Sequence, residues 1–396
     1  MKVLFVNSVC GYGSTGKIVE RLAREVESRG GESLVCYGRY DYLGEVRAVK
    51  ITSKTENYVN AFNARLLDND GFGLKSPTKR LIKVIEEFKP DVINLHNLHG
   101  YYLNMKVLFE YLASTDIKIV WTLHDCWSLT GRCVHFEYAK CDKYLSGCFD
   151  CPQKKEYPTA LLLDNSKNNY KKKQASYEKI KKENLIVVTP SLWLKNIVEK
   201  SILSRFETVC INNGVDLQNF EYKKGDVKKT VLAVASTWTE KKGYKDVIEL
   251  ASRLRGEYKV VMVGVSDKQE DELNGTGIVA IKRTSNQKEL AELYRNALAF
   301  VNPTYEDNFP TTNIEALASG TPVITYKTGG SVEVIENGNG YVVKQGNIDD
   351  LINKIRLVEK DDFDRKAISD NAKAKYSDYK MSEKYMTIFN TLIKSR

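Results

Sequence analysis

Short apolar runs alternate with segments of helical period along almost the whole chain. Residues 2–8, KVLFVNS, form the first run, and in the segment that follows Ile18, Leu22 and Val26 share one helical face. The apolar runs are rich in Val and Ile and do not alternate with polar residues, which is typical of parallel strands buried on both faces. The pattern predicts an α/β fold in which helices cover parallel sheets.

This alternation breaks off once and then starts again. A charged, loop-like stretch separates the two series, and the apolar run TVLAVAS at residues 230–236 opens the second. The restart predicts two facing, Rossmann-like, doubly wound parallel-sheet domains, at residues 1–205 and 206–376. An amphipathic helix at residues 377–396 is expected to cross back to the first domain. Because open sheets bind ligands at the carboxyl ends of their strands, we expect the active site in the cleft between the domains.

Length and composition narrow the class of protein. The chain has 396 residues and 42% hydrophobic residues, which is globular and long enough for about two to three domains. No apolar run approaches the roughly 20 residues that span a bilayer. The apolar start lacks a small-residue cleavage site and runs into a glycine-rich turn, so it reads as a strand and not as a signal peptide. These features predict a cytoplasmic protein, with peripheral contact at the inner face of the membrane as an open alternative.

The charge favours anionic ligands. A net charge of +9 suits a nucleotide, a nucleic acid or an anionic membrane. Lysines concentrate in residues 167–182, which read either as a solvated helix or as a docking face for anionic lipid. Aromatic residues are too sparse there to stack nucleobases, and no nucleic-acid-binding motif is present. We therefore expect no nucleic-acid partner.

Four of the eight cysteines lie close together in the chain. Cys133, Cys141, Cys148 and Cys151 fall within nineteen residues, and the last two form a C-x-x-C pair. Four thiolates could hold a structural zinc ion tetrahedrally. The first gap is irregular for a zinc finger, so free thiols or a redox pair remain the alternatives.

Residues 302–330 carry the strongest chemical signal. They read as the end of a strand, a loop, a short helix and a second strand, so the free N–H groups of a helix start lie beside Asp307. Glu315 follows Asp307 by eight residues. Carboxylates beside an anion site are suited to accept hydroxyl hydrogens, and a ligand with both phosphates and hydroxyls is a nucleotide sugar. The alternative is an ordinary α/β unit with surface carboxylates.

Two further sites follow predicted strands in the first half. The loop from Gly11 to Lys17 fits a dinucleotide glycine pattern and most of a P-loop, but Ile18 stands where a P-loop needs Ser or Thr for magnesium. A P-loop NTPase or kinase remains an alternative on this loop. His124 ends the strand KIVWTLH, and such a histidine points into the ligand cleft.

Taken together, these blocks resemble the GT-B retaining glycosyltransferases of family 4, the kind that build bacterial surface polysaccharides. The resemblance extends over nearly the whole chain. It rests on the glycine-rich first loop, WTLHDCW, TPSLWL, NNGVD, EKKG, the acidic pair before ALASGTPVI, and TGG.

The resemblance implies roles for individual residues. His124 would lie near the transferred sugar, Lys242 would neutralise the donor diphosphate, and Asp307 would meet the sugar. The remaining donor-binding residues would be Gly16, Arg283, Asn308, Phe309, Pro310, Thr311, Thr312 and Glu315. The chain departs from the family where Asp307 replaces the usual Glu. It departs again at Ser236–Trp238, which stand in place of a basic partner of Lys242 that either Lys241 or Arg283 could replace.

The resemblance also implies the chemistry. Lys242 and the helix start would stabilise the departing diphosphate without a metal ion, so no cofactor is expected apart from the candidate zinc. A sugar would pass from a nucleotide-sugar donor to a hydroxyl of a glycan or polyprenyl-linked acceptor, with retention of configuration. A catalytically silent scaffold that binds nucleotide sugar and an epimerase of the same architecture remain alternatives.

Overall fold

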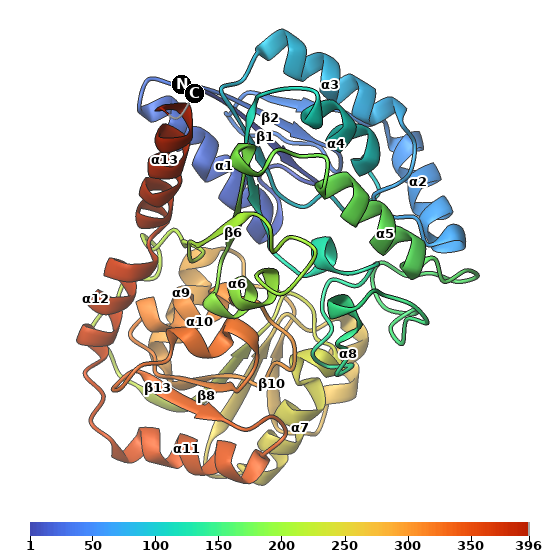
Figure 1. Cartoon of the computed structure of the whole chain (residues 1–396). Coiled ribbons are helices and arrows are strands. Elements are labelled where there is room, and N and C mark those ends of the chain that lie inside the picture. The colour runs from blue at the N-terminus through green and yellow to red at the C-terminus, as the bar shows by residue number, and fades with distance from the viewer. Residues whose placement is uncertain (395–396) are drawn as a thin grey trace. The chain divides into compact units, whose positions relative to one another are not determined.

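The computed structural model describes residues 1–394, which form two compact units (Figure 1). Unit 1 comprises Met1–Asn212 together with residues 381–394, and unit 2 comprises Asn213–Lys380. Each unit is built around one parallel sheet with helices on both faces.

The sheet of unit 1 has seven strands, all parallel, in the order β3-β2-β1-β4-β5-β6-β7. The strands are β1 (Lys2–Asn7), β2 (Glu32–Tyr37), β3 (Ala48–Lys50), β4 (Val92–Leu95), β5 (Lys118–Thr122), β6 (Leu185–Thr189) and β7 (Glu207–Cys210). The helices are α1 (Gly13–Ser28), α2 (Lys54–Leu67), α3 (Ser76–Phe88), α4 (Met105–Ala113), α5 (Ser166–Tyr177), α6 (Leu192–Val198) and, from its fourth residue on, α13 (Asp378–Lys394).

Successive residues of β1 point to opposite faces of this sheet. Leu4 and Val6 pack with α3, α4, α5 and α6, whereas Val3 and Phe5 pack with α1 and α13. This alternation explains the unbroken apolar runs, because both faces of each central strand are buried. Helix α13 is therefore part of the core of unit 1, and Figure 1 shows it beside α1. The last two residues of the predicted C-terminal helix segment lie outside the described residues.

Unit 2 repeats the design with six parallel strands in the order β10-β9-β8-β11-β12-β13. The strands are β8 (Lys228–Val234), β9 (Lys259–Val263), β10 (Ile278–Ile281), β11 (Ala297–Asn302), β12 (Val323–Tyr326) and β13 (Gly340–Val343). The helices are α7 (Tyr244–Arg253), α8 (Asp267–Leu273), α9 (Gln287–Asn296), α10 (Thr311–Ala318), α11 (Ile348–Lys360) and α12 (Arg365–Tyr376). Helices α7 and α11 cover one face, and α9, α10 and α12 cover the other.

Each sheet has one point at which the chain reverses the direction of its winding. In unit 1 this switch point lies between β1 and β4, and in unit 2 it lies between β8 and β11. The loops that leave the carboxyl ends of two such strands diverge to opposite faces, and the crevice between them is the usual ligand site of doubly wound folds. The loops after β1, β4, β8 and β11 are therefore the places where functional side chains are expected.

The predicted fold class, two doubly wound parallel-sheet domains, is confirmed. The cleft between the domains stays a prediction. The structure also contains α2 and β3, which the apolar pattern did not reveal, since only half of α2 (KTENYVNAFNARLL) is apolar and only two of its residues, Asn60 and Ala64, are buried.

The lysine-rich segment forms α5, but it is not exposed along its whole length. Lys173 is completely buried and donates hydrogen bonds to the carbonyl oxygens of Trp127 and Thr130, the latter at 3.0 Å. Tyr170 and Tyr177 on the same helix are buried as well. The interpretation of this segment as a uniformly solvated or lipid-facing helix is therefore wrong at Lys173. Within residues 1–394, no helix combines the length and the apolar character that a membrane span requires.

Candidate functional site

Two loops meet at the switch point of unit 2, and a lysine of one loop contacts a carboxylate of the other. The Nζ of Lys242, which follows β8, lies 2.6 Å from Oδ2 of Asp307, which follows β11. The same Nζ donates to the carbonyl oxygen of Glu306 at 3.3 Å. The side chains of Lys242 and Asp307 are 37% and 19% exposed, so the pair is accessible to a ligand.

Gly243 explains why these loops can approach so closely. Its φ is +76°, a conformation that residues with a side chain rarely adopt, and an added Cβ would lie 2.3 Å from the carbonyl oxygen of Pro303. The backbone N–H of Tyr305 donates to the carbonyl oxygen of Lys241 at 2.8 Å, which ties the second loop to the first. Glycine at the end of the EKKG block thus positions the neighbouring Lys242.

A second ion pair lies next to the first. The Nζ of Lys241 is 3.1 Å from Oε2 of Glu306, whose side chain is only 5% exposed. Arg283, by contrast, is exposed after β10 and makes no ion pair within the described residues. Trp238 is buried, and its Nε1–H donates to the carbonyl oxygen of Val263 at 2.8 Å. This contact holds Ser236–Trp238, the segment that stands where the family usually has a basic residue.

The loop after β11 rests on a buried polar network that the sequence did not reveal. Asn302 donates from Nδ2 to Oδ1 of Asn313 at 2.8 Å, and Asn313 donates in turn to the Oγ of Ser331 at 3.1 Å. Thr325 donates to the carbonyl oxygen of Asn302 at 3.0 Å. Asn313, Thr325 and Ser331 are completely buried. The network links the loop after β11, the start of α10 and the TGG segment into one support. No spacing rule marks such residues.

The start of α10 presents backbone groups and not apolar side chains to a ligand. Pro310 precedes the helix as its N-cap, and Thr311 and Thr312 form its first turn. Phe309 is buried and its ring packs 5.9 Å from that of Tyr376, so only its backbone can serve the predicted role. The predicted site residue Asn308 is also buried.

Glu315 lies in the second turn of α10. The hydroxyl of the buried Tyr294 donates to its Oε2 at 3.3 Å. Burial raises the pKa of Tyr294 well above its ordinary value, and the Glu315 carboxylate adds to this effect. Tyr294 is therefore a neutral donor that orients the carboxylate, a partner that the sequence did not reveal.

A line of hydrogen bonds runs through the switch point of unit 1. His96, after β4, places its Nε2 3.1 Å from Oδ1 of Asn94 and its Nδ1 2.9 Å from Nε2 of His124, which follows β5. The two imidazole rings are stacked with centroids 5.2 Å apart. Asn94 uses its Nδ2 to donate to the carbonyl oxygen of Val120 at 2.9 Å, which leaves Oδ1 as the acceptor.

These contacts fix the protons on both rings. Burial lowers the pKa of His124 to about 4 and that of His96 well below its ordinary value, so both rings are neutral near pH 7. His96 then carries its proton on Nε2 and donates to Asn94, and its Nδ1 accepts from Nε2–H of His124. It follows that Nδ1 of His124 has a lone pair and is a hydrogen-bond acceptor.

His99, also after β4, has the opposite character. Its Nε2 lies 2.7 Å from Oδ2 of Asp125, and its Nδ1 lies 3.1 Å from the hydroxyl of Tyr157. Burial by itself would lower the pKa of His99, but the facing Asp125 outweighs it and raises that pKa. Burial by itself would raise the pKa of Asp125, but His99 and the N–H of Trp127 lower that pKa to about 2.

Gly16 is buried in the first turn of α1, directly after the loop that follows β1. An added Cβ would lie 3.1 Å from both the backbone nitrogen of Gly11 and Cγ2 of Val9. The backbone N–H of Gly11 also donates to the carbonyl oxygen of Gly16 at 3.1 Å. The close packing of the loop on itself is thus a reason for glycine here, beside the predicted approach of a ligand.

The four clustered cysteines line one small cavity of about 20 Å³ in unit 1. A hydrogen bond from Cys133 lowers the pKa of Cys151 to about 6, and the backbone N–H of Gly131 donates to the Sγ of Cys148 at 3.1 Å. All four are free thiols. Within the part of the chain that the structure describes, no three His, Cys, Asp or Glu side chains are arranged as a metal site. The zinc ion stays a prediction, which metal analysis of the purified protein would test.

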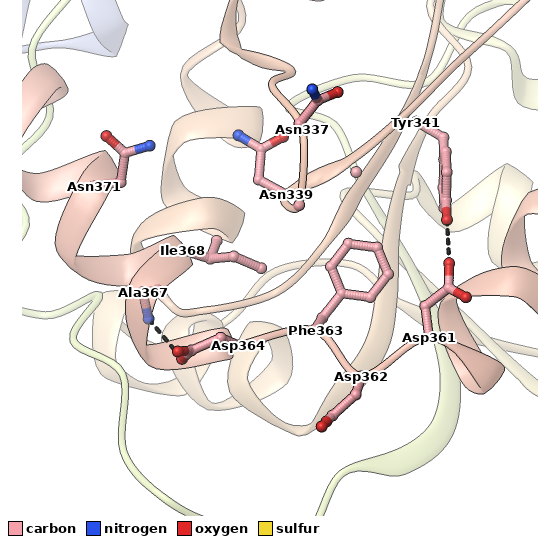
Figure 2. A pocket seen from close by; sticks show the side chains of 12 residues that line it. Asn337, Asn339, Tyr341, Asp361, Asp362, Phe363, Asp364, Ala367, Ile368 and Asn371 are labelled. Carbon is pink, nitrogen blue, oxygen red and sulfur yellow. Dashed lines mark hydrogen bonds between the residues drawn. The ribbon is translucent and has the colours of Figure 1, made fainter.

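A larger cavity in unit 2 lies away from these residues. It has a volume of about 600 Å³ and is lined by the start of β13 and by Asp361–Asp364 (Figure 2). Two of its aspartates are already engaged, Asp361 by the hydroxyl of Tyr341 and Asp364 by the N–H of Ala367 at 2.9 Å. The cavity is at the amino end of β13, whereas Lys242 and Asp307 lie at the carboxyl ends of their strands. It is therefore not the predicted donor site.

Comparison with known proteins identifies the class. Residues 15–219 match the family described as Glycosyltransferase Family 4, and residues 216–375 match Glycosyl transferases group 1. The first match covers more than half of the chain. The protein belongs to glycosyltransferase family 4 and is a glycosyltransferase with the GT-B fold, as the resemblance implied.

Individual relatives agree with this assignment. The chain is 25% identical over 385 residues to the putative colanic acid biosynthesis glycosyl transferase WcaC of Escherichia coli K12, covering 92% of this chain and 90% of that one. A sucrose-phosphate synthase from Thermosynechococcus elongatus has the same fold, with a TM-score of 0.72 and 14% identity over the whole of both chains. Anabaena HepE in complex with UDP aligns over 99% of this chain and 100% of its own, with a TM-score of 0.67 and 14% identity.

Proposed function

We propose that the protein transfers a sugar from a nucleotide-diphosphate sugar to a hydroxyl of a glycan or lipid-linked glycan, with retention of configuration and without a catalytic metal ion. The observation that carries the proposal is the Lys242–Asp307 pair at the switch point of unit 2, beside the start of α10. A cation next to free helix N–H groups suits a diphosphate.

The charge that develops in the reaction matches this end of the site. When the bond between the anomeric carbon and the phosphate oxygen breaks, both electrons stay with the diphosphate, whose negative charge rises. The ammonium of Lys242 and the N–H groups of Thr311 and Thr312 stabilise that charge in place of a metal ion. Asp307 holds the ammonium in position until the diphosphate shares it.

The hydroxyl-binding groups are the carboxylates and the neutral histidine. Glu315, oriented by Tyr294, is suited to accept from the ribose hydroxyls of the nucleotide. The acceptor lone pair on Nδ1 of His124 suits a hydroxyl of the transferred sugar. A neutral His124 does not repel the positive charge that develops at the anomeric carbon.

The proton balance needs no protein base. The acceptor hydroxyl attacks the anomeric carbon on the face that the diphosphate leaves, and its proton passes to the departing phosphate oxygen. One C–O bond breaks and one forms on the same face, which retains the configuration. Within unit 2, the carboxylates next to the proposed diphosphate site, Asp307 and Glu306, are already ion-paired with lysines.

The names of the relatives support polysaccharide assembly as the setting. Besides WcaC, the chain is 30% identical over 122 residues to the capsular polysaccharide biosynthesis glycosyltransferase CapM of Staphylococcus aureus. It is also 29% identical over 177 residues to a Campylobacter jejuni transferase named for a diphospho-undecaprenol acceptor. We infer a surface polysaccharide as the product and a diphospholipid-linked glycan as an acceptor class.

The proposal is tested first by donor binding. Purified protein is heated with UDP-, GDP- and ADP-sugars, and the correct donor is expected to raise the melting temperature, since a ligand at 100 times its Kd adds about 2.7 kcal/mol to the free energy of unfolding. Transfer is then followed with that donor in EDTA, and the rate is expected to stay unchanged. Loss of transfer in EDTA, recovered with magnesium, would refute metal independence. Binding without transfer to any acceptor would favour the scaffold.

A further inference from the structure

Unit 1 contains a cavity lined by cations and tyrosines that the proposed donor chemistry does not use. It has a volume of about 480 Å³ and is lined by one face of α2 along most of its length, by the end of β3 and by the loops after β2 and β4. Four cations line it: Arg39, Lys50, Lys54 and Arg65. The one carboxylate in the lining, Asp41, is taken by Lys50 at 2.7 Å. Three of the four cations therefore make no ion pair within the described residues.

Tyrosines form the rest of the wall, and two of them are held in an unusual backbone conformation. Tyr40 has a φ of +60° and Tyr101 a φ of +67°. A bulky residue in this region is costly and persists only where its surroundings impose it, which is common at ligand sites. For Tyr101 the cause is visible, because the buried Asp70 accepts its backbone N–H at 3.0 Å. The guanidinium of Arg39 lies 5.2 Å and 5.9 Å from the two ring centres.

The cavity opens beside an exposed apolar strip. Tyr58 lines the cavity and is 77% exposed, and Phe62, one turn further along α2, is 61% exposed. Residues 161–163, three leucines that are each more than half exposed, run along the last turn of α2. The N–H of Leu161 donates to the carbonyl oxygen of Arg65 at 2.6 Å. Exposed aromatic and leucine side chains on neighbouring segments suit a hydrocarbon surface.

The cavity also connects to the predicted catalytic end of unit 1. The ring of Tyr101 lies 6.1 Å from that of Tyr157, whose hydroxyl is 3.1 Å from Nδ1 of His99. The N–H of Arg39 donates to the carbonyl oxygen of Ser8, in the loop after β1, at 2.8 Å. Both contacts lie at the carboxyl end of the sheet, the end that also carries His124.

We propose that this cavity binds the diphosphate of a lipid-linked acceptor. Arg39, Lys54 and Arg65 hold the diphosphate, Tyr40 and Tyr101 pack against the attached sugar, and the hydrocarbon chain lies on the strip of Tyr58, Phe62 and residues 161–163. Unpaired cations next to an exposed apolar strip fit an amphiphile with an anionic head better than a free glycan. The inference rests on the proposed function, because it names the acceptor class of that reaction.

Binding to the full-length protein tests the inference directly. Farnesyl diphosphate is the probe, with inorganic pyrophosphate and farnesol as its two halves, measured by calorimetry. Farnesyl diphosphate is expected to bind at least about tenfold more tightly than either half, since both charge and apolar contacts contribute. Equal affinity for farnesyl diphosphate and pyrophosphate would overturn the inference.

Variants assign the binding to the cavity. The double substitution Lys54→Gln with Arg65→Gln is expected to weaken farnesyl diphosphate binding by about tenfold or more. Lys83→Gln is the matched control, because Lys83 is an exposed lysine on the neighbouring α3. Phe62→Ser should weaken binding of farnesyl diphosphate but leave pyrophosphate unchanged. Unaltered affinity in the double variant would place the lipid elsewhere and refute the site.

Two further measurements separate a diphosphate site from a general attraction to anionic lipid and from the donor site. Flotation with phosphatidylglycerol vesicles measures the general attraction, and a loss in the double variant as large as that for farnesyl diphosphate would overturn a diphosphate-specific site. The melting-temperature shift with the nucleotide-sugar donor should be the same in the double variant and the wild type. If the protein transfers sugar to lipid-free glycan and ignores farnesyl diphosphate, the acceptor site is wrong while the proposed function stands.

Discussion

The two switch points use opposite electrostatics on the same fold. In unit 1, the line from Asn94 through His96 to His124 carries no charge, because burial of His96 and partial burial of His124 keep both hydrogen-bonded rings neutral. In unit 2, Lys242 and Asp307 are charged, partly exposed and in direct contact. An uncharged line suits sugar hydroxyls, whereas an accessible cation suits phosphate. The strand order thus determines where a ligand can bind. The burial of the side chains in the loops determines which chemical group of the ligand they can contact.

Removal of the cation in unit 2 is expected to have the largest effect. Lys242→Ala should lower kcat by about 10²–10³-fold, the usual loss when one preorganised contact to a developing negative charge is removed. The rate is measured with saturating donor, and the melting temperature is measured alongside it. An unchanged rate would refute the contrast between the two switch points, because unit 2 would then not supply the decisive charge.

Lys245→Ala is the matched control for that variant. Lys245 lies three residues further on, is largely exposed and forms an ion pair with Glu240. Its removal is expected to leave kcat within about twofold, since exposed ion pairs contribute little. A large loss in this control would mean that the net charge of the loop matters more than the position of Lys242.

The candidate site residues that lie on short, local patterns could be proposed from the sequence. The EKKG block and the acidic pair predicted Lys242, Asp307 and Glu315, and the structure gives Lys242 and Asp307 a direct contact. The glycine of the EKKG block, Gly243, has a physical cause, because the backbone of Pro303 comes too close to it for any residue with a Cβ. Apolar runs predicted the sheets for a similar reason, because burial on both faces leaves a strong trace in the sequence.

Residues whose roles depend on distant partners could not be predicted in this way. His96 matters through His124, 28 residues away, and Asn313 matters through Asn302 and Ser331, which only the fold brings together. Buried polar groups of this kind leave no periodic pattern. The same reason explains the error at Lys173, which looks like its exposed neighbours in a lysine run but lies in the core.

In unit 1, replacement of His124 is expected to have a smaller effect than that of Lys242. His124→Phe removes one neutral hydrogen bond and should lower kcat/KM by about fivefold, as expected for a contact worth roughly 1 kcal/mol. His124→Asn keeps an acceptor near the position of Nδ1 and should recover part of the loss. A decrease of about 10²–10⁴-fold in both variants would instead indicate proton transfer by the imidazole.

The pH behaviour of the histidines differs within unit 1 itself. The pKa of His124 is about 4, below its ordinary value of 6.5, so the unfolded chain binds this proton first as pH falls. The stability that neutral His124 contributes is therefore lost progressively from about pH 6.5 to pH 4. His99, whose pKa is raised, contributes stability at low pH that is lost as pH rises through its folded pKa.

Proton NMR of the ring hydrogens can separate the two histidines. The signal of His99 is expected to titrate above pH 6.5, and that of His124 should show no titration until about pH 4. Asp125→Asn should lower the pKa of His99, because it removes the facing carboxylate. A His124 signal that titrates near pH 6.5 would show that the line of hydrogen bonds in unit 1 is not kept neutral.

The smallest effect is expected at Arg283, which tests how far the charged region of unit 2 extends. Arg283 follows β10, which lies two strands from β8 and thus roughly 10 Å from the loop of Lys242. Lys241 already neutralises Glu306, so Arg283 is the more available second cation for the diphosphate. Arg283→Ala should therefore raise the KM for the donor a few-fold, as expected for one exposed charge contact, and leave kcat nearly unchanged. Arg255→Ala is the control at the amino end of the same sheet. Equal KM values for both variants would confine the functional charge of unit 2 to its switch point.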